Sequence, residues 1–172
     1  IVAAGTGNDA AEALGLTSGA IADRVDRALA DPTPVDLLEC RTTPGGEPLH
    51  AVTSCIAGFP ALVNARAEAM RFPRGPSRYT LATLGAIPRM RPGGFRLTLS
   101  GGPDDGVVVD QRAAVVVIAN LALFGGGMRI CPDARADDGL LDVCLVGDVG
   151  RIALLRAFPK VRTGAHVDHP DV

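Results

Sequence analysis

Carboxylates and glycines that could hold a cation are concentrated in residues 125–143, which read GGGMRICPDARADDGLLDV. Asp137, Asp138 and Gly139 place two carboxylates at a tight turn, where main-chain carbonyl groups can also face a hard cation. The three consecutive glycines at 125–127 allow close backbone packing, or positive φ values that other residues avoid. The stretch predicts a loop between two strands, and both a divalent-cation site and an ordinary turn remain open.

Residues that could bind an anion lie near the start of the chain, in the sequence Gly5-Thr6-Gly7-Asn8-Asp9. They follow a short apolar segment and precede a helical pattern at residues 10–14, which Asn8 or Asp9 can cap. A strand, a glycine turn and a helix N-terminus form an anion site, because the free N–H groups and the helix dipole both favour phosphate. An ordinary strand-to-helix turn also fits these residues.

The elements that must position these candidates change character at residues 31–34, Asp-Pro-Thr-Pro, which predict a domain boundary. Before it, Ile21, Val25 and Leu29 recur at helical spacing and predict a helix over residues 20–30. After it, short strands with regular turn signals are typical of a β-sandwich, and the run at 115–118, apolar on both faces, predicts a central strand. The predicted strands are 35–41 and 49–57, joined as a hairpin, then 94–100, 107–112, 113–122 and 140–146; the predicted helices are 61–70, 78–87 and 149–158.

Together the two motifs resemble signatures of the diacylglycerol kinase catalytic superfamily, the bacterial lipid kinases related to sphingosine and ceramide kinases. Residues 4–9 are similar to that family's GTxND loop, and residues 164–166 resemble its G-x-H segment. The later motif matches at Asn120, residues 125–127, Ile130, Pro132, Ala134 and residues 137–143.

This resemblance implies an α+β fold in two parts. Residues 1–32 would be the end of an α/β nucleotide-binding domain. Residues 33–172 would form an incomplete, mostly antiparallel β-sandwich with helical insertions and a lipid-binding cavity. The implied activity is that of an ATP-dependent lipid kinase, which transfers the γ-phosphoryl group to a hydroxyl of diacylglycerol or a similar lipid.

The resemblance also implies roles for particular residues. Thr6 would contact the nucleotide, and Asn8 and Asp9 would shape the cleft around it. The carboxylate of Asp138, with the main-chain carbonyls of Arg135 and Leu140, would hold a structural Mg²⁺. Asp137 and Asp142 would then serve the turn or the surroundings of the ion.

Two parts of the family's machinery have no counterpart in these 172 residues. They are the phosphate-covering GGDGT loop upstream of GTxND and the catalytic acid in a DGE motif downstream of G-x-H. The sequence also starts within a motif and without Met. We therefore expect a piece of a longer protein that contains no catalytic residue and is inactive alone.

Composition bounds the partners. A net charge of −2 gives the chain no general attraction to nucleic acid. The sequence contains no run of 18 apolar residues, so it predicts no membrane span. We expect a cytoplasmic protein peripheral to the membrane that meets its lipid substrate at the membrane surface, and edge strands could pair two copies as a homodimer.

The seven arginines at positions 66–96 fit either a solvated basic face or contact with anionic lipid. The four cysteines lack zinc-site spacing, which predicts free thiols in a reducing cytoplasm.

Two alternatives remain open from the sequence. One is a non-catalytic module that binds lipid or a partner without transferring phosphate. The other is an enzyme similar to NAD kinases with a soluble substrate, although the DDGLLDV match favours the lipid kinases. No residue selects among diacylglycerol, phosphatidylglycerol, sphingoid bases and polyprenols as the acceptor.

Overall fold

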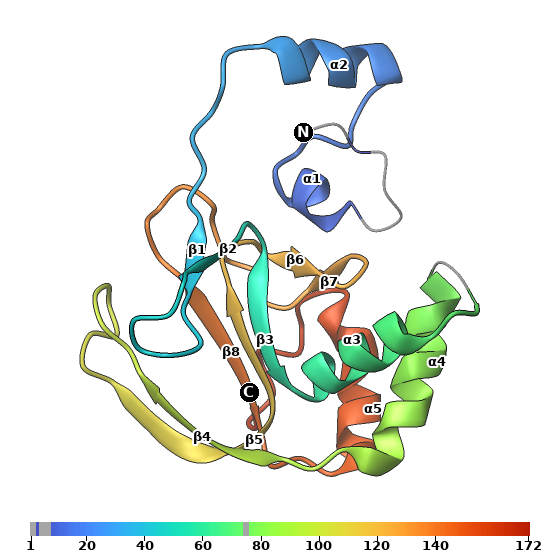
Figure 1. Cartoon of the computed structure of the whole chain (residues 1–172), viewed down its shortest axis with the longest axis vertical. Coiled ribbons are helices and arrows are strands. Elements are labelled where there is room, and N and C mark those ends of the chain that lie inside the picture. Colours follow the sequence, from blue (N-terminus) through green and yellow to red (C-terminus); the bar gives the residue numbers. More distant parts are fainter. Residues whose placement is uncertain (1–2, 4–7, 74–75) are drawn as a thin grey trace.

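The computed structural model describes residues 3, 8–73 and 76–172. Two N-terminal helices stand above an antiparallel β-structure, and three longer helices gather along one side of it (Figure 1). The predicted α+β class is therefore confirmed. In chain order the elements are α1 (Asp9–Ala13), α2 (Ile21–Leu29), β1 (Leu38–Cys40), β2 (Leu49–Ala51), β3 (Ser54–Gly58), α3 (Phe59–Ala69), α4 (Pro76–Ala86), the 3₁₀ helix η1 (Ile87–Arg89), β4 (Gly93–Thr98), β5 (Val108–Ala119), β6 (Leu123–Phe124), β7 (Met128–Arg129), β8 (Asp142–Gly147) and α5 (Arg151–Val161).

The long strand β5 is the centre of the main sheet. Its residue Ala113 pairs with both β4 and β8, and its residue Val115 pairs with both β3 and β8. Because a strand has two edges, β8 lies along one edge of β5, and β3 and β4 follow one another along the other. All of these pairs are antiparallel. The apolar run at 115–118 thus lies in a central strand, as predicted.

The helices α3 and α4 are inserted between the two strands that share an edge of β5. The chain leaves the sheet at Gly58, which has a φ of 77° and pairs with Val115. A Cβ atom at Gly58 would lie 2.5 Å from the carbonyl oxygen of Ala114. Glycine is therefore required twice here, for the left-handed conformation and for the close approach of the two backbones.

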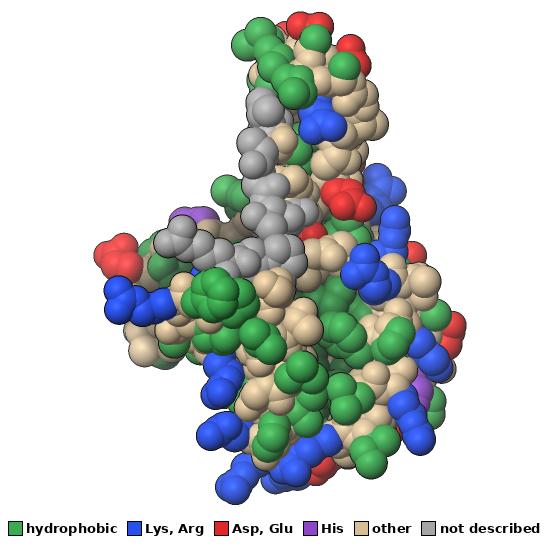
Figure 2. Space-filling view, turned by 90° about the vertical axis from the view of Figure 1, so that its right-hand side faces the viewer, with side chains coloured by type: hydrophobic (Ala, Val, Ile, Leu, Met, Phe, Trp, Pro, Cys, Tyr) green, Lys and Arg blue, Asp and Glu red, His purple; other side chains and the backbone are tan. Residues whose placement is uncertain are grey.

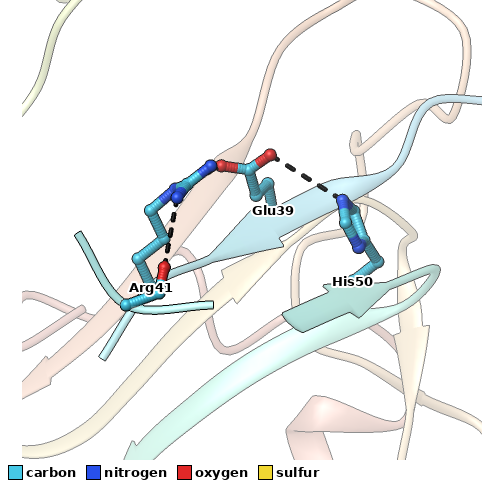
Figure 3. Close-up of polar contacts among 4 residues, drawn as sticks. Glu39, Arg41 and His50 are labelled. Atoms are coloured by element: carbon cyan, nitrogen blue, oxygen red, sulfur yellow. Dashed lines mark hydrogen bonds and ion pairs between the residues drawn. The ribbon is translucent and has the colours of Figure 1, made fainter. Parts of the chain in front are cut away.

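The hairpin predicted from residues 35–41 and 49–57 is present, but both of its strands are shorter than predicted. β1 pairs with β2, and Glu39 lies beside His50 across the pair. Figure 3 shows Glu39 between two basic side chains, with Arg41 Nε 2.7 Å from Oε1 and His50 Nε2 3.7 Å from Oε2. These side chains are about half exposed, so the contacts contribute little to stability.

Two predicted strand boundaries are wrong. Residues 49–57 form two strands, β2 and β3, because the carbonyls of Val52 and Thr53 between them turn to bind Asn120. Residues 107–122 were expected to form two strands, yet residues 108–119 form one. No glycine or proline interrupts the sequence at Arg112 and Ala113, and the ladder continues through a register shift against β8 between Ala113 and Val115.

The core lies between β5, β8 and the segments that follow them. Buried residues of β5 pack with Cys144 and Val146 of β8 and with Ile130 and Cys131, and Leu154 and Val161 of α5 cover this cluster. All four cysteines are free, as predicted. Burial raises the pKa of Cys131 to about 12 and that of Cys144 to about 11, which keeps both as neutral thiols.

None of the helices in the described part of the chain has the length and apolar character needed to cross a bilayer. The division into residues 1–32 and 33–172 stays a prediction. Helix α1 contacts β6, so the short N-terminal part is joined to the rest of the chain near the glycine-rich loop.

Candidate functional site

The three glycines at 125–127 form the loop between β6 and β7, and all have positive φ values of 62°, 92° and 86°. This conformation directs two consecutive amides to the first residue of α1. Gly126 N donates to Asp9 Oδ2 at 2.8 Å, and Gly127 N donates to Asp9 Oδ1 at 2.7 Å. The two motifs singled out in the sequence are thereby joined through one carboxylate.

The acidic turn at 137–139 is also held from a distant part of the chain. Asp138 Oδ1 accepts a hydrogen bond from Leu140 N at 3.0 Å, which closes the turn locally. Gly139, with a φ of 71°, donates its N–H to Asp36 Oδ2 at 2.8 Å. The N–H of Asp36 in turn donates to the carbonyl of Ala136 at 2.7 Å. Asp36 therefore fixes the turn through both its backbone and its side chain.

Asn120 anchors this arrangement to the end of β5. It is fully buried, and its side-chain Nδ2 donates to the carbonyls of Asp36 and Val52, each at 2.9 Å. Its own N–H donates to the carbonyl of Thr53 at 2.8 Å. One amide side chain thus connects the central strand, the β2–β3 junction and the residue that holds the acidic turn.

Several carboxylates lie near one another around the acidic turn. Burial raises the pKa of Asp142, and the negative charges of Asp138 and Asp133 raise it further. Arg135 Nε lies 3.2 Å from Asp137 Oδ1, and this contact raises the pKa of the guanidinium. Arg135 thus pairs with Asp137, while Asp133, Asp138 and Asp142 lie close enough together to raise the pKa of Asp142.

A cavity of about 310 Å³ lies between the N-terminal helix α1 and residues 134–137, which lead into the acidic turn. The end of α1, the linker at 33–35 and residues 121–122 form part of its wall, and residues 134–137 form the rest. The space therefore separates the element that begins at Asp9 from the segment that carries the predicted metal ligands.

The predicted site residues fall in two places. Thr6 lies outside the described residues. Asn8 precedes α1 with a left-handed φ of 57°, and Asp9 binds the glycine loop. Arg135, Asp138 and Leu140 lie together in and beside the acidic turn. Their roles as metal ligands remain predictions. The described residues contain no group of three or more His, Cys, Asp or Glu side chains suited to a metal. That finding does not bear on a site built from one carboxylate and two carbonyls.

Sequence reasoning missed two connections. Asp36 lies in no motif, and its partner Gly139 is 103 residues away, so no local pattern could indicate the contact. Asn120 is part of the matched family signature, but the signature alone gave no reason for an amide at that position. Its buried hydrogen bonds to two carbonyls now supply one.

Comparison with known proteins identifies the family. Residues 53–172 match the family described as the YegS C-terminal NAD kinase beta sandwich-like domain. The match covers more than half of the chain, and the chain belongs to this family.

Named relatives agree with this assignment, and solved structures share the fold. The chain is 39% identical to a diacylglycerol kinase of Mycobacterium tuberculosis over 175 residues, which cover 100% of the chain and 54% of the relative. A Shewanella frigidimarina protein named "Probable lipid kinase YegS-like" is 29% identical and is covered to 49%, with 94% of this chain aligned. A crystal structure of a diacylglycerol kinase from Bacillus anthracis str. Sterne shares the fold, with a TM-score of 0.61 and 22% identity over 100% of this chain and 52% of that one. The chain spans about half the length of the curated relatives it matches.

Proposed function

We propose that the protein containing this chain is an ATP-dependent lipid kinase. It transfers the γ-phosphoryl group of ATP to a hydroxyl of diacylglycerol or a similar lipid. The observation that carries the proposal is the pair of hydrogen bonds from Gly126 and Gly127 to Asp9, because they bring the nucleotide motif and the acidic motif into one assembly. The names of the relatives support the substrate class.

In this proposal the chain supplies binding and positioning, and it carries no catalytic residue. Asp9 holds the glycine loop beside the start of α1, Asn8 helps to shape the cleft, and Thr6 would contact the nucleotide. The attacking hydroxyl forms a bond to the γ-phosphorus while the bond from that phosphorus to the bridging oxygen breaks and ADP leaves. The base that takes the hydroxyl proton lies outside these residues, so the chain alone is inactive.

The residues of the acidic turn fit a Mg²⁺ ion. Mg²⁺ favours oxygen ligands and keeps several waters, and Asp138 with the carbonyls of Arg135 and Leu140 offers such a donor set. Burial is the larger cause of the raised pKa of Asp142, and the repulsion from Asp138 and Asp133 that adds to it would be relieved by a cation. The ion would supply a fixed positive charge that stabilises this turn.

The test is phosphorylation of a mixed lipid extract by the full-length protein with γ-labelled ATP. The chain offers a matched control variant, because Asp105 is also the second residue of an Asp-Asp-Gly turn and accepts a backbone N–H, that of Gly101, at 2.7 Å. We expect labelled lipid from the wild type and from Asp105→Ala, and at least tenfold less from Asp138→Ala.

The labelled product would identify the acceptor. Absence of labelled lipid from a folded wild-type protein that contains the two outlying motifs would reject the lipid-kinase proposal in favour of a binding module or a soluble substrate. Equal labelling by both variants would reject the role of Asp138 alone.

A further inference from the structure

The charges of this chain are sorted by structural layer. Residues 59–92 and 149–165, which hold α3, α4, η1 and α5, contain ten basic residues and one acidic residue, Glu68. The rest of the chain contains seven basic and eighteen acidic residues. A chain with a net charge of −2 therefore carries a strongly positive helical layer beside a strongly negative remainder.

The structure brings these two helical segments to the same side of the molecule. The helices α3, α4 and α5 lie together beside the sheet (Figure 1). Arg151 at the start of α5 donates from Nη2 to the carbonyl of Pro88 in η1 at 2.8 Å, which joins the segments across 63 residues. The sequence showed only the first basic segment, and the contribution of α5 comes from the fold.

The basic side chains of this layer that the structure describes have no carboxylate partner there, although Arg89 and Arg151 each donate to a main-chain carbonyl. No ion pair within the described residues involves them, whereas Arg41, Arg96, Arg112 and Arg135 elsewhere in the chain each pair with a carboxylate. The one acidic residue, Glu68, accepts a hydrogen bond from Asn64 of its own helix. Positive charge on this layer is therefore neutralised by no partner among these residues.

The same layer exposes large apolar side chains. On α4, Leu81 and Leu84 are spaced to share one face of the helix, opposite the buried Ala82 and Ala86. On α5, Leu154 and Val161 are partly buried and pack against the core, while most other side chains of the helix are exposed. The exposed set is Phe72 (83% exposed), Leu81 (49%), Leu84 (57%), Ile152 (68%), Leu155 (47%) and Phe158 (49%).

Figure 2 looks onto this side of the molecule. Hydrophobic side chains form a broad area over its lower half, and Lys and Arg gather around the lower edge of that area. Exposed apolar area of this kind marks an interaction site. Apolar side chains surrounded by basic ones are the composition that enters the headgroup region of an anionic bilayer.

We propose that this basic–apolar face, formed by α3, α4 and α5, docks the protein on an anionic lipid bilayer. The apolar side chains enter the boundary between headgroups and acyl chains, and the unpaired Arg and Lys residues contact lipid phosphates. The inference rests on the proposed function in one respect, since a membrane-embedded acceptor gives docking its purpose.

The test is co-sedimentation of the full-length protein, without ATP, with vesicles of phosphatidylcholine alone or of phosphatidylcholine and phosphatidylglycerol in equal parts. We expect binding to the mixed vesicles that weakens with salt, and little binding to phosphatidylcholine alone. Each basic residue near an anionic surface contributes roughly a fivefold gain in affinity. Arg156→Glu with Lys160→Glu should therefore lower binding by about 25-fold or more. Arg41→Glu with Arg96→Glu makes the same charge change just after β1 and in β4, and should leave binding within about twofold.

A second pair of variants tests the apolar contribution. Leu84→Gln with Ile152→Gln should weaken binding to mixed vesicles. Ile21→Gln with Leu29→Gln removes apolar side chains that are even more exposed, on α2 (74% and 80%), and should not weaken binding. Equal binding to both vesicle types, equal effects of face and control variants, or burial of the face by another part of the protein or a second copy would overturn the proposal.

Activity assays separate docking from catalysis. On diacylglycerol in vesicles the face variants should lose activity in step with binding, and on a short-chain, water-soluble diacylglycerol they should match the wild type. A wild type that phosphorylates neither substrate but still binds anionic vesicles would reject the kinase and keep the docking face. A wild type that phosphorylates both without vesicle binding would reject the docking face and keep the kinase.

Discussion

Asp9 and Gly127 are 118 residues apart in the sequence, yet Asp9 Oδ1 accepts a hydrogen bond from Gly127 N at 2.7 Å. The second oxygen of the same carboxylate is bound by Gly126 N. Asp9 is also the first residue of α1, where a negative charge is favoured by the helix dipole. A single side chain thus connects the start of a helix to a loop of three adjacent glycines with positive φ values.

Replacing Asp9 with Ala should release the glycine loop. Hydrogen bonds to a charged group contribute about 1.5–3 kcal/mol each, and partial exposure here reduces the expected loss to about 1–3 kcal/mol in total. Amide exchange in residues 125–127, measured by mass spectrometry on the full-length protein, should accelerate by about 5-fold to 100-fold. Asp104→Ala, in an exposed turn, is the control and should leave this exchange unchanged. Unchanged exchange in Asp9→Ala would show that the loop is held by other contacts.

Replacing Asp36 with Ala should loosen the acidic turn, because Gly139 N loses its acceptor. If the turn holds a cation, Asp36 orients the residues that bind it. Loss of such an orienting group at other metal sites typically lowers metal affinity or activity by about 10-fold to 100-fold. Lipid phosphorylation by the full-length protein should then fall by about 10-fold to 100-fold. The affinity for Mg²⁺, measured by titration, should weaken in parallel.

The control for this prediction is Asp31→Ala, an exposed acidic residue five positions earlier in the same linker. It should leave both activity and Mg²⁺ affinity within about twofold of the wild type. A loss of activity in Asp31→Ala as large as that in Asp36→Ala would attribute the effect to the linker as a whole.

Local pattern predicted the elements well where the signal was itself local. The apolar run at 115–118 indicated a central strand, and the spacing of Ile21, Val25 and Leu29 indicated a helix; both are present. The burial of that helix was less predictable, since its three apolar residues are exposed in this chain. The helical spacing identifies the apolar face of the helix, but it does not show whether another part of the protein covers that face.

The candidate site was predictable only as two separate motifs. Resemblance selected Asp9 and Asp138, but the contacts that hold their loops, from Gly126 and Asp36, cross more than 100 residues. Hydrogen bonds over such distances depend on how strands pair, and no pattern within either motif encodes that pairing. The splitting of residues 49–57 has the same origin, because the break is made by carbonyl groups that bind the distant Asn120.

Gly58→Ala should be among the most destabilising single substitutions at a glycine. A Cβ atom would lie 2.5 Å from the carbonyl oxygen of Ala114, and the φ of 77° adds left-handed strain. Strain of about 1–2 kcal/mol and a steric clash of about 1–3 kcal/mol predict a loss of about 2–4 kcal/mol. The midpoint of urea unfolding should fall accordingly.

Gly45→Ala separates the two causes. Gly45 has a similar φ of 73°, but nothing lies within 4 Å of its Cβ position. It should lose only the strain, about 1–2 kcal/mol. Equal effects of the two substitutions would mean that β3 and β5 can separate at Gly58 without cost.

The stability of the chain should fall as the pH is lowered below about 6.5, because of His166. The ring is buried (2% exposed), and its Nε2 lies 3.0 Å from the carbonyl of Ile130, to which it donates a hydrogen bond. Burial lowers the pKa of His166, although the carbonyls of Ile130 and Gly164 favour the protonated ring. Below the ordinary pKa of 6.5 the histidine of the unfolded chain binds a proton more readily than the buried histidine of the folded chain. The free energy of unfolding therefore decreases as the pH falls below this value, and it does not depend on this group at higher pH.

The measurement is urea unfolding between pH 5 and pH 8 for the wild type, His166→Gln and His50→Gln. His50 is exposed, so its variant should keep the wild-type pH dependence, whereas His166→Gln should flatten the decline. Should His166→Gln fail to fold, NMR titration of the wild-type ring decides the question. A ring that stays neutral with its proton on Nε2 below pH 6.5 supports the prediction. A ring that protonates at or above pH 6.5 in the folded protein contradicts it, since the folded state would then bind the proton at least as well as the unfolded chain.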